Sequence, residues 1–230
     1  MATLLKCNAI YLHIPKTGGT FLKNLFEKMN LVEFGFSRDH ADMERVVNIS
    51  NHYPGNYLLR SIQLKRNLET HIQQCYKFTF VRNPFDWYES YWRFMEDLKW
   101  KPFTNIPART RFGFPQDTWH PFKPIEKYGH SNFNIFIENI IKHEPGFLTN
   151  MYNGFTSPEH IDFVGKQENL MEDILTIFRQ LKIPYDPNLI NLNYKINESK
   201  ASRPSWDKDN KNLLFKLEEE TFKKYGYENH

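Results

Sequence analysis

The segment PKTGGT at positions 15–20 combines one lysine, two adjacent glycines and two hydroxyl side chains. Gly18 and Gly19 allow the backbone to approach a ligand closely, and a helix that begins after them directs its N–H groups and its positive dipole end at an anion. Lys16 adds a full positive charge. The segment therefore predicts a site for a phosphate or sulfate group; the alternative is an ordinary glycine turn with a solvated lysine.

The order of residues in this loop differs from that of the common nucleotide-binding loop. In the GxxxxGK[ST] pattern the lysine follows the second glycine, whereas Lys16 precedes both glycines. The order Pro-Lys-Thr-Gly-Gly-Thr after a strand resembles the 5′-phosphosulfate loop of sulfotransferases that use 3′-phosphoadenosine-5′-phosphosulfate (PAPS) and release 3′-phosphoadenosine-5′-phosphate (PAP). The resemblance implies that this loop holds the donor nucleotide, through Lys16, Thr17, Gly18, Gly19 and Thr20.

The resemblance requires a second site for the 3′-phosphate, and the segment FVRNPFDWYESYW offers one. Arg82 ends an apolar run, and Ser90 lies eight positions later in a helix that Pro84 can begin. A guanidinium is a forked and permanently charged donor, and a hydroxyl about two turns into the helix can meet it at one phosphate. The pair looks like the family's 3′-phosphate motif. Taken alone, Arg82 would be a helix-end contact and Ser90 a surface serine.

Further segments from about residue 9 to residue 227 extend the resemblance. FVGKQENLMEDI at 163–174 is similar to a strand-to-helix segment that commonly has an aromatic residue where this chain has Gln167; if that residue stacks on adenine in relatives, this chain must hold the base differently. NESKASRP resembles a loop that closes over the nucleotide, which makes Lys200 and Arg203 candidates for a second contact with the 3′-phosphate, or else parts of a solvated basic loop. The final FKKYGY resembles the last helix of glycan-type sulfotransferases, although Lys224 stands where relatives often have an acid.

Sulfuryl transfer to an alcohol needs a general base for the hydroxyl proton. His52, in SNHYPGNYLLR, resembles the histidine of an H-x-x-A/G segment in carbohydrate sulfotransferases, and a histidine titrates near neutral pH. His40 is the second candidate, whereas His13 is expected to be a strand residue that positions the loop. Glu89 and Asp117 stay open as bases because some relatives use a carboxylate.

These residues need a scaffold of strand–turn–helix units. Residues 9–14 and 76–81 are apolar runs typical of buried strands, and each precedes an amphipathic pattern, so two parallel strands with crossover helices are predicted. We expect one α/β domain over residues 1–230, with a P-loop-like, three-layer arrangement and a central parallel sheet. Further helices are predicted at 57–72, 131–143, 168–182 and 207–225, and a short strand at 162–165.

Residues 100–130 hold five prolines and many aromatic side chains, which disfavours regular structure. A loop of this length is usually functional or disordered, and its aromatic content argues against disorder. Its aromatic faces suit sugar rings or apolar lipid parts and its cations suit an acidic head group, so we expect a lid on the acceptor side; a lid that only packs on the core is the alternative. The residues concerned are Trp100, Phe103, Phe112, Phe114, Trp119, Lys101, Arg109 and Arg111.

Composition limits the class of protein. The formal net charge of +3 over 230 residues is too weak a bias to predict nucleic-acid binding, and two cysteines fit neither a disulfide framework nor a zinc site. No metal is expected, and the lack of a long apolar window predicts a cytoplasmic protein with no membrane span. The acceptor is expected to be a carbohydrate or glycolipid hydroxyl. An ATP-dependent small-molecule kinase and a non-catalytic nucleotide or sulfated-glycan binding protein remain as alternatives.

Overall fold

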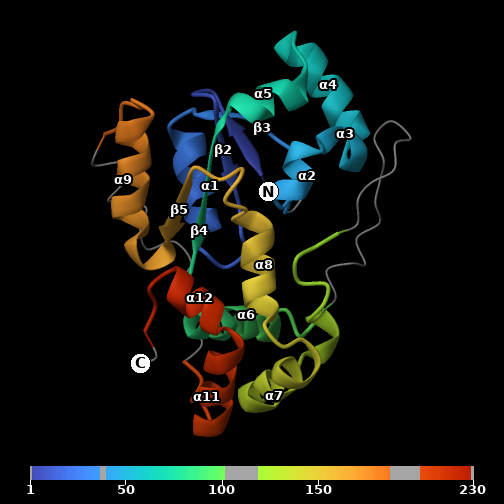
Figure 1. Cartoon of the computed structure of the whole chain (residues 1–230), viewed down its shortest axis with the longest axis vertical. Helices are drawn as coiled ribbons and strands as arrows, with labels where there is room; N and C mark the ends of the chain where they lie inside the picture. Colours follow the sequence, from blue (N-terminus) through green and yellow to red (C-terminus); the bar gives the residue numbers. More distant parts are fainter. Residues whose placement is uncertain (1, 37–39, 102–118, 187–202, 229–230) are drawn as a thin grey trace.

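A computed structural model describes residues 2–36, 40–101, 119–186 and 203–228 (Figure 1). Its sheet has the strand order β3-β1-β2-β4-β5. Strands β2, β4 and β5 are parallel neighbours, which confirms the predicted α/β class with a parallel centre. The strands are β1 (Thr3–Leu5), β2 (Ala9–Leu12), β3 (Val32–Gly35), β4 (Tyr76–Val81) and β5 (Phe163–Lys166).

Strand β1 makes the sheet mixed, because it runs antiparallel to both of its neighbours. The chain reverses between β1 and β2 at residues 6–8, where Asn8 adopts a left-handed φ of 55° and its N–H bonds to the Leu5 carbonyl at 3.1 Å. Asparagine tolerates this conformation better than most residues. A strand of three residues leaves too short a pattern to be predicted, so this antiparallel edge is an addition to the central parallel sheet that the sequence predicts.

The parallel register brings the functional segments to one edge of the sheet. Leu12 pairs with Thr79, and Val81 pairs with Lys166, so the carboxyl ends of β2, β4 and β5 point the same way. Ligands of open α/β sheets bind outside this edge. The loop at 13–18, the 82–83 connection and the 167–169 turn all leave the sheet there.

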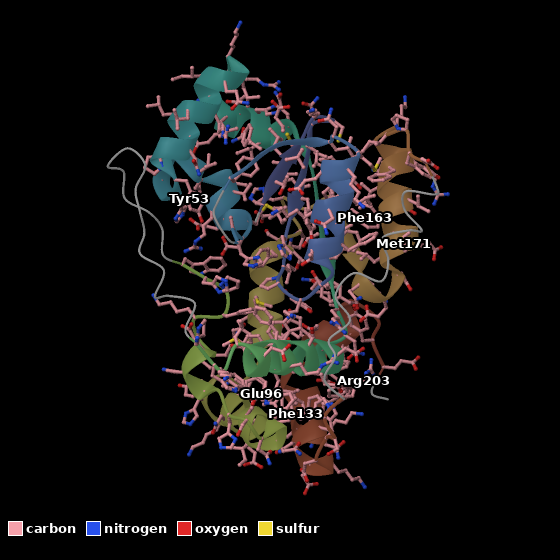
Figure 2. The ribbon with its side chains drawn as sticks, turned by 180° about the vertical axis from the view of Figure 1, so that it is seen from behind. Tyr53, Glu96, Phe133, Phe163, Met171 and Arg203 are labelled. Carbon is pink, nitrogen blue, oxygen red and sulfur yellow. The ribbon has the colours of Figure 1, made fainter. Side chains whose placement is uncertain are left out.

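Alternate strand residues face two separate cores, which gives three layers. Ala9, Tyr11, Phe78 and Phe80 pack in one cluster with α1 (Gly19–Lys28) and α9 (Leu170–Gln180). Ile10 and Leu12 belong to the other cluster, which contains buried residues of α6 (Pro84–Asp97), α7 (Phe133–His143) and α8 (Phe147–Phe155). Figure 2 shows α1 in front of the sheet, on the same face as the helix that carries Met171.

The remaining elements refine the predicted helices. The helix predicted at 57–72 is two helices, because Lys65 takes a left-handed φ of 53° that ends the first of them. The helix predicted at 207–225 divides at Glu218, whereas the other predicted helices and the strand at 162–165 are confirmed within a few residues. Helix α8 was not predicted. The other elements are α2 (Met43–Val47), α3 (Ile49–His52), α4 (Pro54–Leu64), α5 (Leu68–Gln74), η2 (Glu126–Tyr128), η3 (Gln167–Asn169), α11 (Lys208–Leu217) and α12 (Glu219–Lys224).

Candidate functional site

The loop between β2 and α1 has two left-handed residues. Lys16 has a φ of +69° and Gly18 a φ of +90°, after which α1 begins at Gly19. A β-carbon on Gly18 would lie 2.8 Å from a methyl carbon of Leu170, and one on Gly19 would overlap the His13 ring. The left-handed φ favours glycine at position 18, and the close approach of the His13 ring requires it at position 19; Lys16 carries a conformation that is uncommon for a side chain of its length.

The carbonyls of residues 14–16 are all held by side chains. Each of the three consecutive groups accepts one hydrogen bond, so the polar backbone atoms on that side of the loop are already satisfied. The donors are Thr17 Oγ1 to Ile14 O at 2.8 Å, Trp87 Nε1 to Pro15 O at 2.9 Å, and Arg82 Nη1 to Lys16 O at 3.3 Å. The N-cap of α1, Gly18, supplies no side-chain hydrogen bond. This helix end is thus open to an anion.

The Lys16 ammonium lies 4.1 Å from the centre of the Phe94 ring on α6. Burial, followed by the positive charges of Arg82 and Arg93, lowers the pKa of Lys16 to about 8, and Asp97 opposes this shift. A ring face is a weak partner for a cation compared with a carboxylate. The site therefore concentrates positive charge.

Arg82 follows the carboxyl end of β4, and one tyrosine side chain holds both its main-chain N–H and its carbonyl. The Tyr152 hydroxyl accepts from the Arg82 N–H at 3.1 Å and donates to the Arg82 carbonyl at 3.0 Å. Arg82 Nε is buried without a hydrogen-bond partner, and burial lowers the pKa of this guanidinium. Ser90 is part-buried on α6, a helix that Asn83 caps by accepting from the Phe85 N–H. A buried donor of this kind is satisfied by a ligand or by an ordered water.

Segments at the end of β5 complete this edge. Glu168 accepts from the Asn83 N–H at 2.7 Å and from the Tyr227 hydroxyl at 3.0 Å, which joins β4, η3 and the segment after α12. Gln167 lies beside the loop, because its Cγ is 3.7 Å from the place where a β-carbon on Gly18 would be. The predicted loop, Arg82 and Gln167 are therefore brought together.

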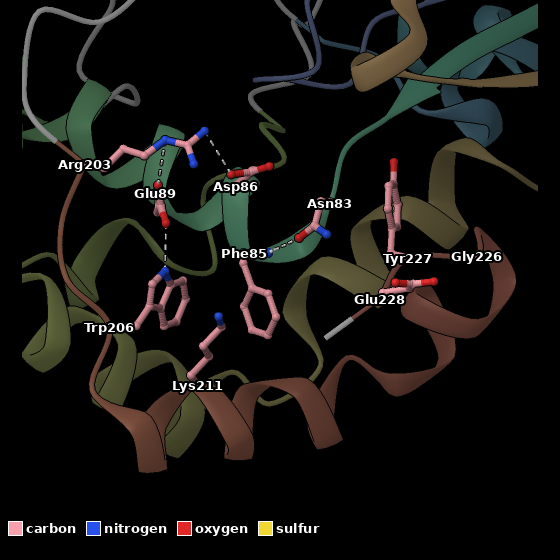
Figure 3. A pocket seen from close by; sticks show the side chains of 10 residues that line it. All are labelled: Asn83, Phe85, Asp86, Glu89, Arg203, Trp206, Lys211, Gly226, Tyr227 and Glu228. Atoms are coloured by element: carbon pink, nitrogen blue, oxygen red, sulfur yellow. Dashed lines mark hydrogen bonds and ion pairs between the residues drawn. The ribbon is translucent and has the colours of Figure 1, made fainter. Parts of the chain in front are cut away.

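Arg203 lies across the first turns of α6 (Figure 3). Its guanidinium is exposed, with Nη2 3.5 Å from an Asp86 oxygen and Nε 3.9 Å from Glu89 Oε2. Glu89 Oε1 accepts from the Trp206 indole at 2.8 Å. Glu89 is thus buried among structural partners rather than presented as a base. Two further predicted site residues, Lys200 and Asp117, lie outside the described residues.

The histidine candidates occupy two places. His52 ends α3, and its Nε2 is 2.8 Å from a carboxylate oxygen of Glu44. His40 Nδ1 is 2.7 Å from the His13 carbonyl, so Nδ1 carries the proton and Nε2 is left as an acceptor. The rings of His13 and His40 are 4.6 Å apart, and burial lowers the pKa of both. His120, which the sequence did not single out, lies 5.3 Å from His40.

The expected lid is described only at its ends, because residues 102–118 lie outside the described part. Trp100 donates to a Glu96 oxygen at 2.7 Å, and the Trp119 ring lies 4.1 Å from the Arg45 guanidinium. Both indoles pack against the core. Within the described residues no group of His, Cys, Asp or Glu could hold a metal ion, and no helix is long and apolar enough to cross a membrane.

Sequence reasoning missed the residues that fix the loop. Trp87 and Phe94 lie three residues before and four residues after Ser90 on α6, so all three share one side of this helix. This spacing could have predicted that both rings lie near the loop. Tyr152 belongs to the unpredicted α8, and its contact with Arg82 left no local signal.

Comparisons with known proteins gave one result. A family model described as "Sulfotransferase family" matches residues 5–225. No curated protein and no solved structure gave a significant match.

Proposed function

Because the chain belongs to the sulfotransferase family and therefore uses PAPS as sulfuryl donor, we propose that it transfers the sulfuryl group to a carbohydrate or glycolipid hydroxyl. The observation that carries the transfer itself is the concentration of buried cations at one sheet edge, and the choice of acceptor rests on the resemblance to carbohydrate sulfotransferases. Lys16 rests on an aromatic ring, Arg82 Nε has no partner, and the N-terminus of α1 is uncapped beside them. Donor phosphates would supply the missing acceptors.

We assign the sulfuryl end of the donor to the loop. Lys16 and the N–H groups at the start of α1 stabilise negative charge where the transferring group would lie. Thr17 acts through its backbone alone, since its buried hydroxyl already bonds to Ile14. Thr20 is exposed in the first turn of α1. The donor brings an activated sulfuryl group, and the chain's part is to hold it and to offset its charge.

We assign the 3′-phosphate to Arg82 and Ser90. The buried Nε and the guanidinium fork of Arg82 lie at the start of the helix that carries Ser90. Arg203, and with it Lys200, would give a second contact, for which Arg203 must exchange Asp86 and Glu89 for the phosphate. The exposed and long ion pairs of Arg203 make this exchange inexpensive.

We propose His52 as the general base. A base is commonly oriented by a third group, and Glu44 has this geometry at His52. His40 is the alternative, because its acceptor Nε2 is set by the His13 carbonyl. We also propose that residues 1–230 form one catalytic domain. Within it, the aromatic segment at 100–130 would be a lid on the acceptor side.

Replacing His52 with Asn tests the base. Turnover should fall about 10²–10⁴-fold with PAP affinity nearly unchanged, because the base touches the acceptor rather than the donor. His160→Asn, at a histidine outside the site, is the control. Normal turnover in folded His52→Asn would move the assignment to His40.

A nucleotide titration tests the function itself. PAP should bind at least tenfold more tightly than adenosine 5′-monophosphate, and [³⁵S]PAPS should label a glycan from an acceptor panel. Preference for ATP with phosphate transfer would favour the kinase alternative. PAP binding without transfer to any acceptor would favour a binding protein.

A further inference from the structure

Helix α4 presents apolar side chains to solvent along one side. Leu58, Leu59 and Ile62 are 51%, 46% and 66% exposed, and α4 contains no fully buried residue. At about 100° per residue, these three side chains fall within about 100° of one another around the helix axis. They form one continuous surface, which we name the α4 stripe. Figure 1 shows α4 at one end of the molecule, with α7 and α11 at the other.

The opposite side of α4 fastens the helix to the rest of the protein. Tyr57 and Leu64 pack, partly buried, against the core. Asn56 donates to the backbone carbonyl just after β3, and Ser61 Oγ accepts from the first N–H of α5 at 3.2 Å. The Arg60 guanidinium lies 4.6 Å from the centre of a phenylalanine ring of β3. Because these contacts hold α4 from its inner side, the α4 stripe is free to make a contact of its own.

Positive side chains stand beside the α4 stripe. Lys65 and Arg66 follow the helix directly and are exposed. Arg66 Nη2 donates to His71 Nε2 at 3.1 Å, and an imidazole that accepts is neutral, so this contact leaves the arginine charge uncompensated. The chain has no acid between Glu44 and Glu69, and Glu69 accepts from the N–H and hydroxyl of one α3 residue at 3.1 and 2.5 Å. The apolar surface is thus bordered by positive charge.

This combination matches the surface of a membrane that contains anionic lipids. A helix that lies in the headgroup region buries its apolar side among the acyl chains and keeps its cations at the lipid phosphates. A second protein molecule is a poorer match, because three half-exposed side chains offer much less than the roughly 800 Å² that each partner of a stable complex buries.

We propose that the α4 stripe inserts into the surface of an anionic membrane, with Lys65 and Arg66 at the lipid phosphates. The contact is peripheral, made by one side of one helix. Helix α5 leads from α4 into the amino end of β4, whereas the loop at 13–18 lies at the carboxyl ends of the strands. Docking through α4 therefore leaves the loop uncovered, and the inference does not depend on the proposed acceptor.

Co-sedimentation of the full chain with vesicles tests the proposal. Wild-type protein should bind vesicles of phosphatidylcholine and phosphatidylserine in equal parts, and bind vesicles of phosphatidylcholine alone more weakly. Leu58→Ser/Ile62→Ser should weaken binding to the mixed vesicles roughly tenfold or more, because the burial of two apolar side chains is lost. The matched control is Ile135→Ser/Leu213→Ser, at exposed apolar side chains of α7 and α11.

Replacing the cations tests the part played by lipid charge. Each cation near an anionic surface corresponds to roughly a fivefold change in affinity, so Lys65→Gln/Arg66→Gln should bind the mixed vesicles about 25-fold more weakly. Its binding to phosphatidylcholine alone should be unchanged. Lys142→Gln/Lys216→Gln, at exposed lysines of α7 and α11, is the control for lost charge. Thermal unfolding checks that each variant folds, and PAP affinity should match that of the wild type.

Three results would overturn the inference. The first is a wild-type protein that binds neither kind of vesicle. The second is undiminished binding by folded Leu58→Ser/Ile62→Ser, or an equal loss in its α7 and α11 control. The third is self-association of the wild type that Leu58→Ser/Ile62→Ser abolishes, without any vesicle binding, since a second copy of the chain would then cover the α4 stripe. PAP binding is measured separately, so each of these results leaves the proposed function standing.

Discussion

Helix α6 separates two charges that the protein treats in opposite ways. On one side the Lys16 ammonium contacts the Phe94 ring and has the cations Arg82 and Arg93 near it. On the other side Glu218, fully buried, accepts from the Tyr88 hydroxyl at 2.7 Å. Glu218 also accepts from the Leu148 and Thr149 N–H groups and from Thr149 Oγ1.

The difference shows how to distinguish a structural charge from a functional one. Glu218 caps α8, a helix whose N-cap Gly146 has no side chain, and so ties the α11–α12 junction to α6 and α8. Its partners are all present without any ligand. Lys16 has no comparable set within the described residues. A buried charge is stable only when its hydrogen bonds are made, and we propose that the donor anion supplies those of Lys16.

The largest effect is expected from Lys16→Met, which keeps the apolar stem on Phe94 and removes the charge. Turnover should fall about 10²–10³-fold, because developing charge at the transferring group loses its offset. PAP affinity should fall less than it does in Arg82→Ala, and thermal stability should not fall. Lys23→Met, at an exposed lysine of α1, is the control. Equal losses of PAP affinity in Lys16→Met and Arg82→Ala would contradict the assignment of Lys16 to the transferring group and of Arg82 to the 3′-phosphate.

Glu218→Gln should reverse that pattern. The amide presents a donor to partners that are themselves donors, so the free energy of unfolding should drop by about 2–4 kcal/mol. Urea unfolding measures it. PAP affinity of the folded protein should be unchanged. Glu219→Gln, at an exposed neighbour paired with Lys223, serves as the matched control. A stable Glu218→Gln protein would show that this network contributes little.

Arg82→Ala should erase most of the preference for PAP over adenosine 5′-monophosphate. A charged contact of this kind corresponds to about 1.5–3 kcal/mol, so tenfold or more of the discrimination should vanish. Arg179→Ala on α9 is the control for loss of an arginine. An unchanged preference would place the 3′-phosphate at Arg203 and Lys200.

The smallest expected effect is the uptake of a proton by Lys16 when PAP binds. An anion at the loop favours the charged lysine, so it raises the pKa of Lys16 from about 8, and PAP affinity should decline as pH rises through that value. Ligand-free protein should gain stability from about pH 8 towards 10.5, because the unfolded chain still holds this proton. Titrations at pH 8 in buffers of different protonation enthalpy measure the uptake, which Lys16→Met should abolish.

Local motifs predicted the parts of the site that are contiguous in sequence. The PKTGGT loop and Arg82 with Ser90 carry their chemistry within a few residues, so their positions followed from a strand–turn–helix reading. The break at Glu218 could not be predicted, because the apolar spacing continues through 207–225 and tertiary hydrogen bonds impose the division. Tyr227 stood in a quoted segment, yet its approach to Glu168 joins residues far apart in the chain.

The three held carbonyls of residues 14–16 have a kinetic consequence. Thr17, Trp87 and Arg82 fix this backbone during folding, so the entropy of ordering the loop is not lost again when a nucleotide arrives. Association then requires an encounter with a positively charged edge rather than a slow rearrangement of the loop. Differences in affinity among nucleotides should therefore arise mainly from their rates of departure.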